Sequence, residues 1–188
     1  MQATHRFSVA QVMKQPQRLL PEWSESLRSI DGVKLNVRSA GPGDEAPLER
    51  FFERVTQEDL RFRYLGAVRP SADFTDRITR EDPARVETLL AFNAAGGNLA
   101  AIATVAAEPG STDAEVAVLV RSDLKGRGIG WAMLDHACRQ AAALGFKNAV
   151  AVEASENRSA ITLEQELGFT ARQHPQDATL TILSKALA

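Results

Sequence analysis

Apolar and polar residues alternate in several short segments of this chain, which is the pattern of half-buried β-strands. Residues 33–38 read Val-Lys-Leu-Asn-Val-Arg and so place their apolar side chains on one face. Residues 85–92 and 99–107 are two further strand candidates, and the glycine-containing stretch between them predicts a hairpin turn. Residues 114–120 are almost continuously apolar, as expected for a strand in the centre of a sheet.

In other segments the apolar residues recur every three or four positions, which is the period of an amphipathic helix. This spacing predicts a helix over about residues 46–55, with Asp44 accepting hydrogen bonds from its first backbone N–H groups. Two shorter, arginine-rich helices are expected over residues 58–65 and 71–79. A longer helix is predicted over residues 128–144, where a glycine closes it.

The last forty or so residues add one helix and three strands to this order. A strand is expected over residues 148–153, a helix over 157–167, and two final strands over 170–174 and 178–183. Strands and helices therefore both contribute throughout the chain. The order of elements indicates an α/β (α+β) protein with one central sheet flanked by helices.

Composition narrows the class of protein further. The 188 residues suffice for one domain with a proper core, so we expect an N-terminal arm with a short helix at residues 1–30 and a single domain over residues 31–188. The net charge of −2 gives no sign of a nucleic-acid or membrane partner. The single cysteine, Cys138, excludes an internal disulfide. Neither a membrane-spanning run nor a secretory signal is evident, so we expect a cytoplasmic protein.

The most informative segment joins the strand ending at Val120 to the helix that follows it. Three glycines alternate there, Gly126, Gly128 and Gly130, with a lysine before them and an arginine among them. Glycine permits a tight turn and leaves the backbone amide groups open to a ligand. Because a helix N-terminus presents unpaired N–H donors and partial positive charge, this loop predicts a phosphate or pyrophosphate site.

Two familiar phosphate-binding loops do not fit this spacing. A P-loop requires four residues between its first glycine and a Gly-Lys-Ser/Thr, and that arrangement is absent from the sequence. A dinucleotide fingerprint requires Gly-x-Gly-x-x-Gly/Ala, but the last position is Trp131 or Met133, depending on the starting glycine. A glycine loop can also serve as a turn alone, and that alternative remains.

The loop resembles a third pattern, the Gln/Arg-x-x-Gly-x-Gly/Ala signature of the GNAT superfamily of acetyltransferases. Lys125 stands where that family usually has glutamine or arginine. Residues 157–161 and 167–169, Asn-Arg-Ser-Ala-Ile and Leu-Gly-Phe, are similar to the second motif of the same family and lie at the family's separation from the first. The resemblance covers about residues 113–169. It implies the GNAT fold, with a central mixed, mostly antiparallel sheet of about six to seven strands.

The same resemblance implies acetyl-CoA (coenzyme A) as co-substrate and a set of residues that bind it. Backbone groups of two valines in the central strand would bind the pantetheine arm, the glycine loop the pyrophosphate, and an asparagine the other side of the cleft. In this sequence the implied residues are Val118, Val120, Lys125, Gly126, Arg127, Gly128, Ile129, Gly130 and Asn157. Asn157 is also a suitable N-cap for the helix that it begins, and both roles are compatible.

Acylation of an amine requires a base, and Glu115 is our candidate for it. It is the single ionisable residue of the strand over residues 114–120, where burial would raise its pKa toward neutrality. Many GNAT enzymes carry a catalytic glutamate near this point. The alternative is a glutamate that points to solvent at a strand end. The general acid is less evident, because Glu164 stands where many members of the family have a tyrosine.

Other chemistries have little support in the sequence. Cys138 lies in the middle of a predicted helix and is expected to be a small buried residue. The three histidines, His5, His136 and His174, have no metal-ligand spacing with one another or with this cysteine, so no metal site is expected.

The acceptor is suggested by the first half of the chain. Residues 31–38, 48–52 and 61–66 look like the acetyltransferase domain of bacterial protein lysine acetyltransferases of the Pat type. The resemblance therefore implies acetyl transfer to a protein lysine side chain. Two alternatives remain, which are a small-molecule amine acetyltransferase and a non-catalytic module that senses acyl-CoA. The sequence does not fix the oligomeric state, and a homodimer is among the options.

Overall fold

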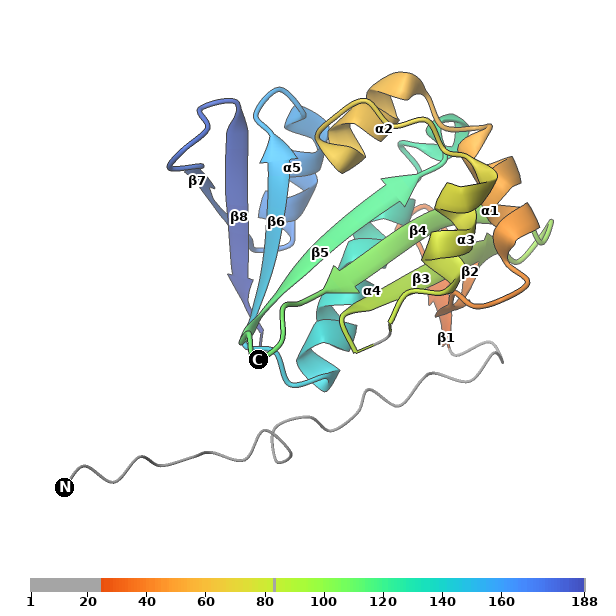
Figure 1. Ribbon diagram of the computed structural model, residues 1–188, viewed down its shortest axis with the longest axis horizontal. Helices are drawn as coiled ribbons and strands as arrows, with labels where there is room; N and C mark the ends of the chain where they lie inside the picture. Colours follow the sequence, from red (N-terminus) through yellow and green to blue (C-terminus); the bar gives the residue numbers. More distant parts are fainter. Residues whose placement is uncertain (1–24, 83, 188) are drawn as a thin grey trace.

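The computed structural model describes residues 25–82 and 84–187, and its strands form one sheet in the order β1-β2-β3-β4-β5-β6-β8-β7 (Figure 1). The strands are β1 (Glu25–Arg28), β2 (Lys34–Ser39), β3 (Val86–Asn93), β4 (Leu99–Ala106), β5 (Asp113–Val120), β6 (Asn148–Ala154), β7 (Thr170–Gln173) and β8 (Leu180–Ala186). The helices are α1 (Glu45–Phe52), α2 (Gln57–Tyr64), α3 (Ala72–Thr79), α4 (Ile129–Ala143) and α5 (Arg158–Glu166).

The sheet confirms the predicted mixed, mostly antiparallel architecture. Neighbouring strands pair antiparallel except β5 and β6, which pair in parallel. Eight strands are found in the described residues instead of the six or seven expected, and the additional strand is β1. It pairs with β2 from Glu25 opposite Val37 to Arg28 opposite Lys34. The predicted arm therefore contributes an edge strand at residues 25–28, while residues 1–24 lie outside the described part of the chain.

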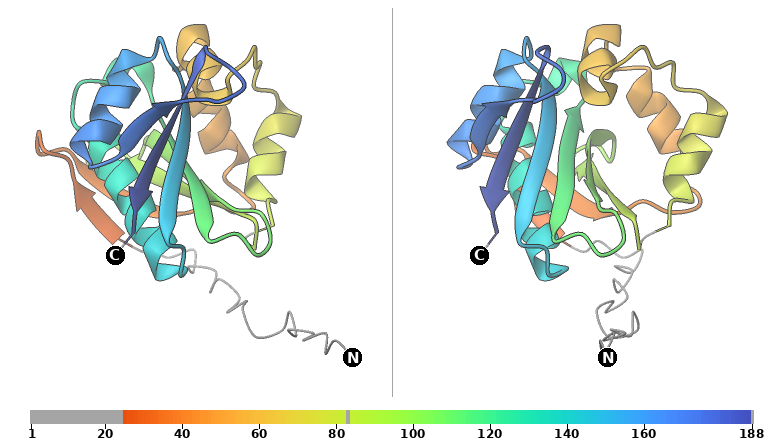
Figure 2. Two further views of the ribbon diagram at one scale, coloured as in Figure 1. Left: turned by 90° about the vertical axis from the view of Figure 1, so that its left-hand side faces the viewer. Right: turned by 60° about the vertical axis from the view of Figure 1, so that its left-hand side comes forward.

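Helices cover both faces of the sheet, which explains why its central strands are apolar on both sides (Figure 2). In β3, Leu89 is buried in the cluster that includes α4, and its neighbour Leu90 is buried in the cluster that includes α1. Successive side chains of a strand point to opposite faces, so a strand between two helical layers must be apolar throughout. The central strands thus form a rigid support for the loops at their ends.

One local prediction is corrected by the structure. Asp44 occupies the N-cap position of α1, but its side chain makes no cap hydrogen bond to the helix. Its carboxylate instead accepts the Arg38 guanidinium through both oxygens and the Gly41 N–H at 2.9 Å. A nearby guanidinium competes successfully for the carboxylate because charge-assisted, bidentate hydrogen bonds are stronger than neutral ones.

Candidate active site

The site begins where β5 and β6 separate. The two strands pair only from Asp113 opposite Asn148 to Glu115 opposite Val150, although each continues for several residues. Beyond this point they diverge toward α2 and α5 (Figure 1). The edge of β5 that faces β6 therefore has no partner strand over its last residues, and its backbone groups are open to a ligand that lies alongside.

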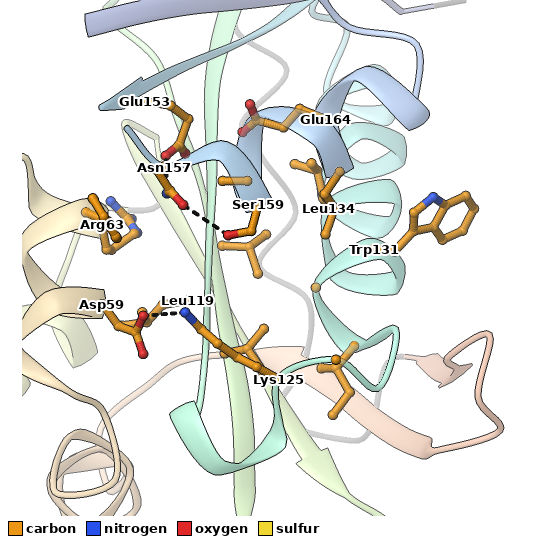
Figure 3. A pocket seen from close by; sticks show the side chains of 18 of the residues that line it. Asp59, Arg63, Leu119, Lys125, Trp131, Leu134, Glu153, Asn157, Ser159 and Glu164 are labelled. Carbon is orange, nitrogen blue, oxygen red and sulfur yellow. Dashed lines mark hydrogen bonds and ion pairs between the residues drawn. The ribbon is translucent and has the colours of Figure 1, made fainter. Parts of the chain in front are cut away.

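A pocket fills the opening between the separated strands (Figure 3). Its walls come from the end of β5, the glycine loop with the first turns of α4, the inner face of α5, and α2. The lining includes Val118, Leu119, Val120, Lys125, Gly126, Gly128, Ile129, Gly130, Asn157 and Glu164. Segments that are far apart in the sequence thus meet at one cleft.

The glycine loop has the geometry of an anion site. Gly126 and Gly128 have φ angles of +69° and +68°, a conformation that L side chains rarely adopt. The 15-residue helix α4 begins directly afterwards at Ile129. Its first residues, Ile129 and Gly130, line the pocket, and the N-terminus of a helix carries unpaired N–H groups and the positive end of the helix dipole. Loop and helix end therefore fit the pyrophosphate of coenzyme A.

Two of the loop glycines also pack closely against other segments of the chain. A Cβ atom at Gly128 would lie 2.4 Å from Cγ1 of Ile30 in the β1–β2 turn. A Cβ atom at Gly130 would lie 3.3 Å from Cδ1 of Leu163 in α5. The loop is therefore packed between the edge turn of the sheet and α5, so a side chain at Gly128 would displace it, whereas one at Gly130 would require only a small shift of the Leu163 side chain.

Lys125 is bound to the opposite wall of the pocket. Its ammonium group donates a hydrogen bond to the carboxylate of Asp59 in α2, which also accepts from the hydroxyl of Ser122 (Figure 3). Although burial raises the pKa of Asp59, hydrogen bonds from Lys125, Ser122 and Thr56 outweigh it and hold that pKa below its usual value. The ion pair joins α2 to the glycine loop and fixes the width of the cleft.

Replacing Asp59 with asparagine is expected to lower the free energy of unfolding by about 1–3 kcal/mol at neutral pH, because it leaves a buried hydrogen-bond network incomplete. The folded-state pKa of Asp59 is depressed, so the contribution of its charge is present above the unfolded pKa and is lost as pH falls through the folded one. The difference between wild type and D59N should therefore shrink below about pH 4. Urea unfolding at several pH values measures it.

Glu58→Gln is the matched control for this prediction, since Glu58 is the exposed carboxylate next to Asp59 in the same helix turn. It removes the same charge near the helix N-terminus without touching Lys125. An equal loss of stability in both variants would contradict the specific role of the ion pair.

One buried and one half-buried carboxyl group line the inner side of the pocket (Figure 3). Glu153 of β6 accepts a hydrogen bond from Nδ2 of Asn157 at 2.8 Å. Burial raises the pKa of Glu153 above its usual value. Glu164 of α5 is only 4% exposed, and burial together with the charge of Glu153 raises its pKa to about 9. One of these two groups is therefore protonated at neutral pH.

The side chain of Asn157 lines the pocket and does not cap helix α5. It stands at the N-cap of α5 but makes no side-chain cap hydrogen bond. Its amide group bridges Glu153 and the hydroxyl of Ser159, which donates to Oδ1 at 3.2 Å. The proposed contact with the cofactor is thus compatible with this structure, whereas capping by the side chain is not found.

The structure brings most of the predicted site residues together. Those that line the pocket are Val118, Val120, Lys125, Gly126, Gly128, Ile129, Gly130 and Asn157. Arg127 is exposed and is not part of the lining. Glu115 lies apart from the pocket, in a second hollow with Glu81 and Glu108, and its side chain is exposed. The burial that we expected for Glu115 is therefore not found.

Several lining residues were missed by the sequence reasoning. Arg63 of α2 reaches Thr104 Oγ1 of β4 at 2.7 Å, and its buried Nε has no hydrogen-bond partner within the described residues. Asp59 and Glu153 were also missed as members of the site. The arginine-rich pattern of α2 was visible, but nothing in its spacing shows that this helix closes the pocket.

Other candidate chemistries find no support in the part of the chain that the structure describes. Cys138 is buried, as predicted, and burial raises the pKa of its thiol to about 11. Within residues 25–82 and 84–187, no three His, Cys, Asp or Glu side chains group closely enough to hold a metal ion. None of the helices in these residues has the length and apolar character needed to cross a membrane.

Comparison with known proteins agrees with this geometry. A model of the acetyltransferase (GNAT) family matches residues 52–169, which is more than half of the chain. The chain is similar to the GNAT domain of S. lividans PAT, with 26% identity, a TM-score of 0.79, and coverage of 89% of this chain and 98% of that one.

Two further solved structures share the fold. One is spermidine N-acetyltransferase from Vibrio cholerae in complex with CoA and spermine, with 14% identity and a TM-score of 0.68. The match covers 81% of this chain and 95% of the Vibrio cholerae one. The other is a cAMP-binding acyltransferase from Mycobacterium smegmatis, with 21% identity and a TM-score of 0.59. The match covers 87% of this chain but 47% of the mycobacterial one.

Proposed function

Because this chain belongs to the acetyltransferase (GNAT) family, and is thus an acetyl-CoA-dependent N-acetyltransferase, we propose that its acceptors are lysine side chains of proteins. We further propose Glu115 as the base. The similarity to the GNAT domain of S. lividans PAT supports the acceptor class. The observation that carries the proposal is the place of Glu115 in β5, in the last residue pair before β5 and β6 separate, with its side chain in a second, acidic hollow.

The binding of acetyl-CoA follows from the pocket walls. We propose that the loop from Gly126 to Gly130 and the N-terminus of α4 hold the pyrophosphate, with Lys125 and Arg127 adding positive charge. The unpaired edge of β5 at Val118 and Val120 would receive the amide groups of the pantetheine arm like an added strand. Asn157 would contact the arm from the α5 side. Bound in this way, acetyl-CoA supplies the thioester carbonyl that the amine attacks.

Glu115 stands where this arm would end. It forms the last residue pair between β5 and β6, and Val118 lies three residues further along β5. At about 3.3 Å per residue, this is a separation of about 10 Å. The carboxylate lines the second hollow, apart from the glycine loop, so we propose that a lysine side chain enters through this hollow and meets the carboxylate on its way to the thioester.

The second hollow suits a positively charged acceptor. Its lining contains five carboxylate side chains and a single arginine: Glu81, Asp82, Glu108, Asp113, Glu115 and Arg85. A hollow with this excess of negative charge attracts an ammonium group and raises its local concentration. Its open form also leaves room for the polypeptide that carries the lysine.

The acceptor class can be tested by comparing initial rates on two sets of amines at a fixed concentration of acetyl-CoA. We expect lysine-containing polypeptides to show kcat/KM values at least about 10-fold above those of free polyamines, because only polypeptides extend beyond the hollow. Release of the free thiol measures both. Higher values for the polyamines would favour a small-amine acetyltransferase, and binding without turnover would favour an acyl-CoA sensor.

A further inference from the structure

A buried carboxyl group lies in the pocket in which we propose that acetyl-CoA binds. Glu164 extends from α5 and lines this pocket together with Glu153 and Asn157 (Figure 3). Its side chain is 4% exposed, and its carboxyl group hydrogen-bonds with that of Glu153, whereas Oε2 has no well-aligned hydrogen-bond partner among the residues described. A buried polar atom without a partner is costly, so its presence at a ligand pocket indicates a function.

The environment of Glu164 keeps the proton on this residue and not on its neighbour. Glu153 receives the hydrogen bond of the Asn157 amide and the positive charge of Arg63, which both favour its ionised form. The titratable groups near Glu164 are the carboxylate of Glu153 on β6 and the neutral thiol of Cys138 on α4. No positively charged group contributes to the shift of the Glu164 pKa. These surroundings favour the proton of the pair on Glu164.

We propose that the Glu164 carboxyl is the acid that protonates the coenzyme A thiolate as it departs, and that Glu153 is its positioning residue. The proposal deepens the acetyl transfer described above and rests on it. The observation that carries it is geometric, since a buried carboxyl oxygen without a hydrogen-bond partner among the described residues lies in the pocket that Val118 and Val120 of β5 also line.

The proton transfer completes the reaction without a further reactant. The amine nitrogen attacks the thioester carbon, forms the C–N bond and loses its proton to the base. When the tetrahedral intermediate collapses, the carbonyl bond reforms, the C–S bond breaks, and its electron pair remains on sulfur. The Glu164 O–H gives its proton to that sulfur. Two adjacent carboxylates are then buried together, so the pair recovers a proton from water before the next turnover.

Glu164→Gln tests the proposal, because it preserves the shape of the side chain and removes the acidic proton. We expect kcat to fall by about 100-fold, within the range found for general acids, while the Kd for acetyl-CoA changes less than about 3-fold. Glu166→Gln is the control, since it makes the same change at an exposed position of the same helix. Its kcat should match that of the wild type.

The pH dependence separates an acid from a structural residue. An acid must be protonated to act, so the ratio of wild-type to E164Q rates should fall as pH rises through about 9. Glu153→Gln removes the negative charge that holds the proton on Glu164, so its fall in rate should begin at lower pH. A ratio that stays constant across this range, or an E164Q kcat within about 3-fold of wild type, would overturn the proposal.

An infrared measurement keeps the test independent of turnover. At neutral pH the wild-type protein should show the carbonyl stretch of a protonated carboxylic acid, and E164Q should lack it. If the signal persists in E164Q, the proton is elsewhere and the proposal is wrong. If the wild type binds acetyl-CoA but acetylates no amine, both the proposed acetyl transfer and the role of Glu164 are contradicted. If the ratio of wild-type to E164Q rates does not change with pH, only the role of Glu164 is contradicted.

Discussion

Gly128→Ala is expected to weaken acetyl-CoA binding by about 10- to 100-fold, which corresponds to about 1.4–2.8 kcal/mol. Gly128 has a φ angle of +68°, and an added Cβ would lie 2.4 Å from Cγ1 of Ile30 and 3.1 Å from its backbone nitrogen. Both the strain and the contact would move the loop that we propose binds the pyrophosphate. Isothermal calorimetry with acetyl-CoA measures the effect.

Gly97→Ala is the matched control for the loop variant. Gly97 lies in the β3–β4 turn with a φ angle of +66°, and a Cβ there would meet nothing within 4 Å. It therefore carries the same backbone strain without the close contact and away from the pocket. Equal acetyl-CoA affinity in wild type and G128A would show that the glycine loop is not the pyrophosphate site, provided that both variants are folded by circular dichroism.

Glu115→Gln is expected to lower kcat by about 10²–10⁴-fold, because it removes the base that accepts the amine proton. The Kd for acetyl-CoA should remain unchanged, since Glu115 does not line the cofactor pocket. Steady-state rates with a saturating lysine peptide and calorimetry with acetyl-CoA separate the two quantities. The effect should diminish at high pH, where the acceptor amine loses its proton without help.

Glu108→Gln controls for the loss of negative charge from the second hollow. Glu108 lines the same hollow, is exposed, and pairs with Arg85 at 3.0 Å. Its removal should raise KM for a basic peptide and leave kcat unchanged. If E115Q behaves in the same way as E108Q, then Glu115 only attracts the acceptor, and the buried carboxyl pair becomes the candidate for the base.

The helices and strands whose apolar residues follow one clear period could be predicted well from the sequence. The helix predicted over residues 128–144 is found as α4 (Ile129–Ala143), and the strand over 114–120 as β5 (Asp113–Val120). β1 was missed because it has four residues and only Leu27 is buried. An edge strand this short carries little alternation, and tertiary pairing decides its structure.

The glycine loop was predictable because its residues are adjacent in the chain, whereas the rest of the pocket was not. Asp59, Arg63 and Glu153 come from α2 and β6, and they meet only because β5 and β6 separate after Glu115. A single sequence does not reveal where two parallel strands stop pairing. The prediction that Glu115 is buried was wrong for a related reason. The sequence of an apolar strand does not show which positions on its faces are left uncovered by other elements.

Some assignments made from the sequence stay proposals. The division into an arm at residues 1–30 and a domain at 31–188 is one, although the pairing of β1 with β2 places residues 25–28 in the sheet. A cytoplasmic location and a homodimer are others. The contact of Arg127 with the pyrophosphate is also a proposal, and its exposed side chain is free to turn toward the pocket mouth.

Peptide mass spectrometry is the most direct test of the proposed acetylation of protein lysine side chains. The purified protein is incubated with isotopically labelled acetyl-CoA and a deacetylated cell lysate, with E115Q and a reaction without enzyme in parallel. We expect labelled acetyl groups on specific lysine side chains, well above the chemical background, with wild type and not with E115Q. If the wild-type protein yields no labelled lysine above that background, protein lysine acetylation is contradicted.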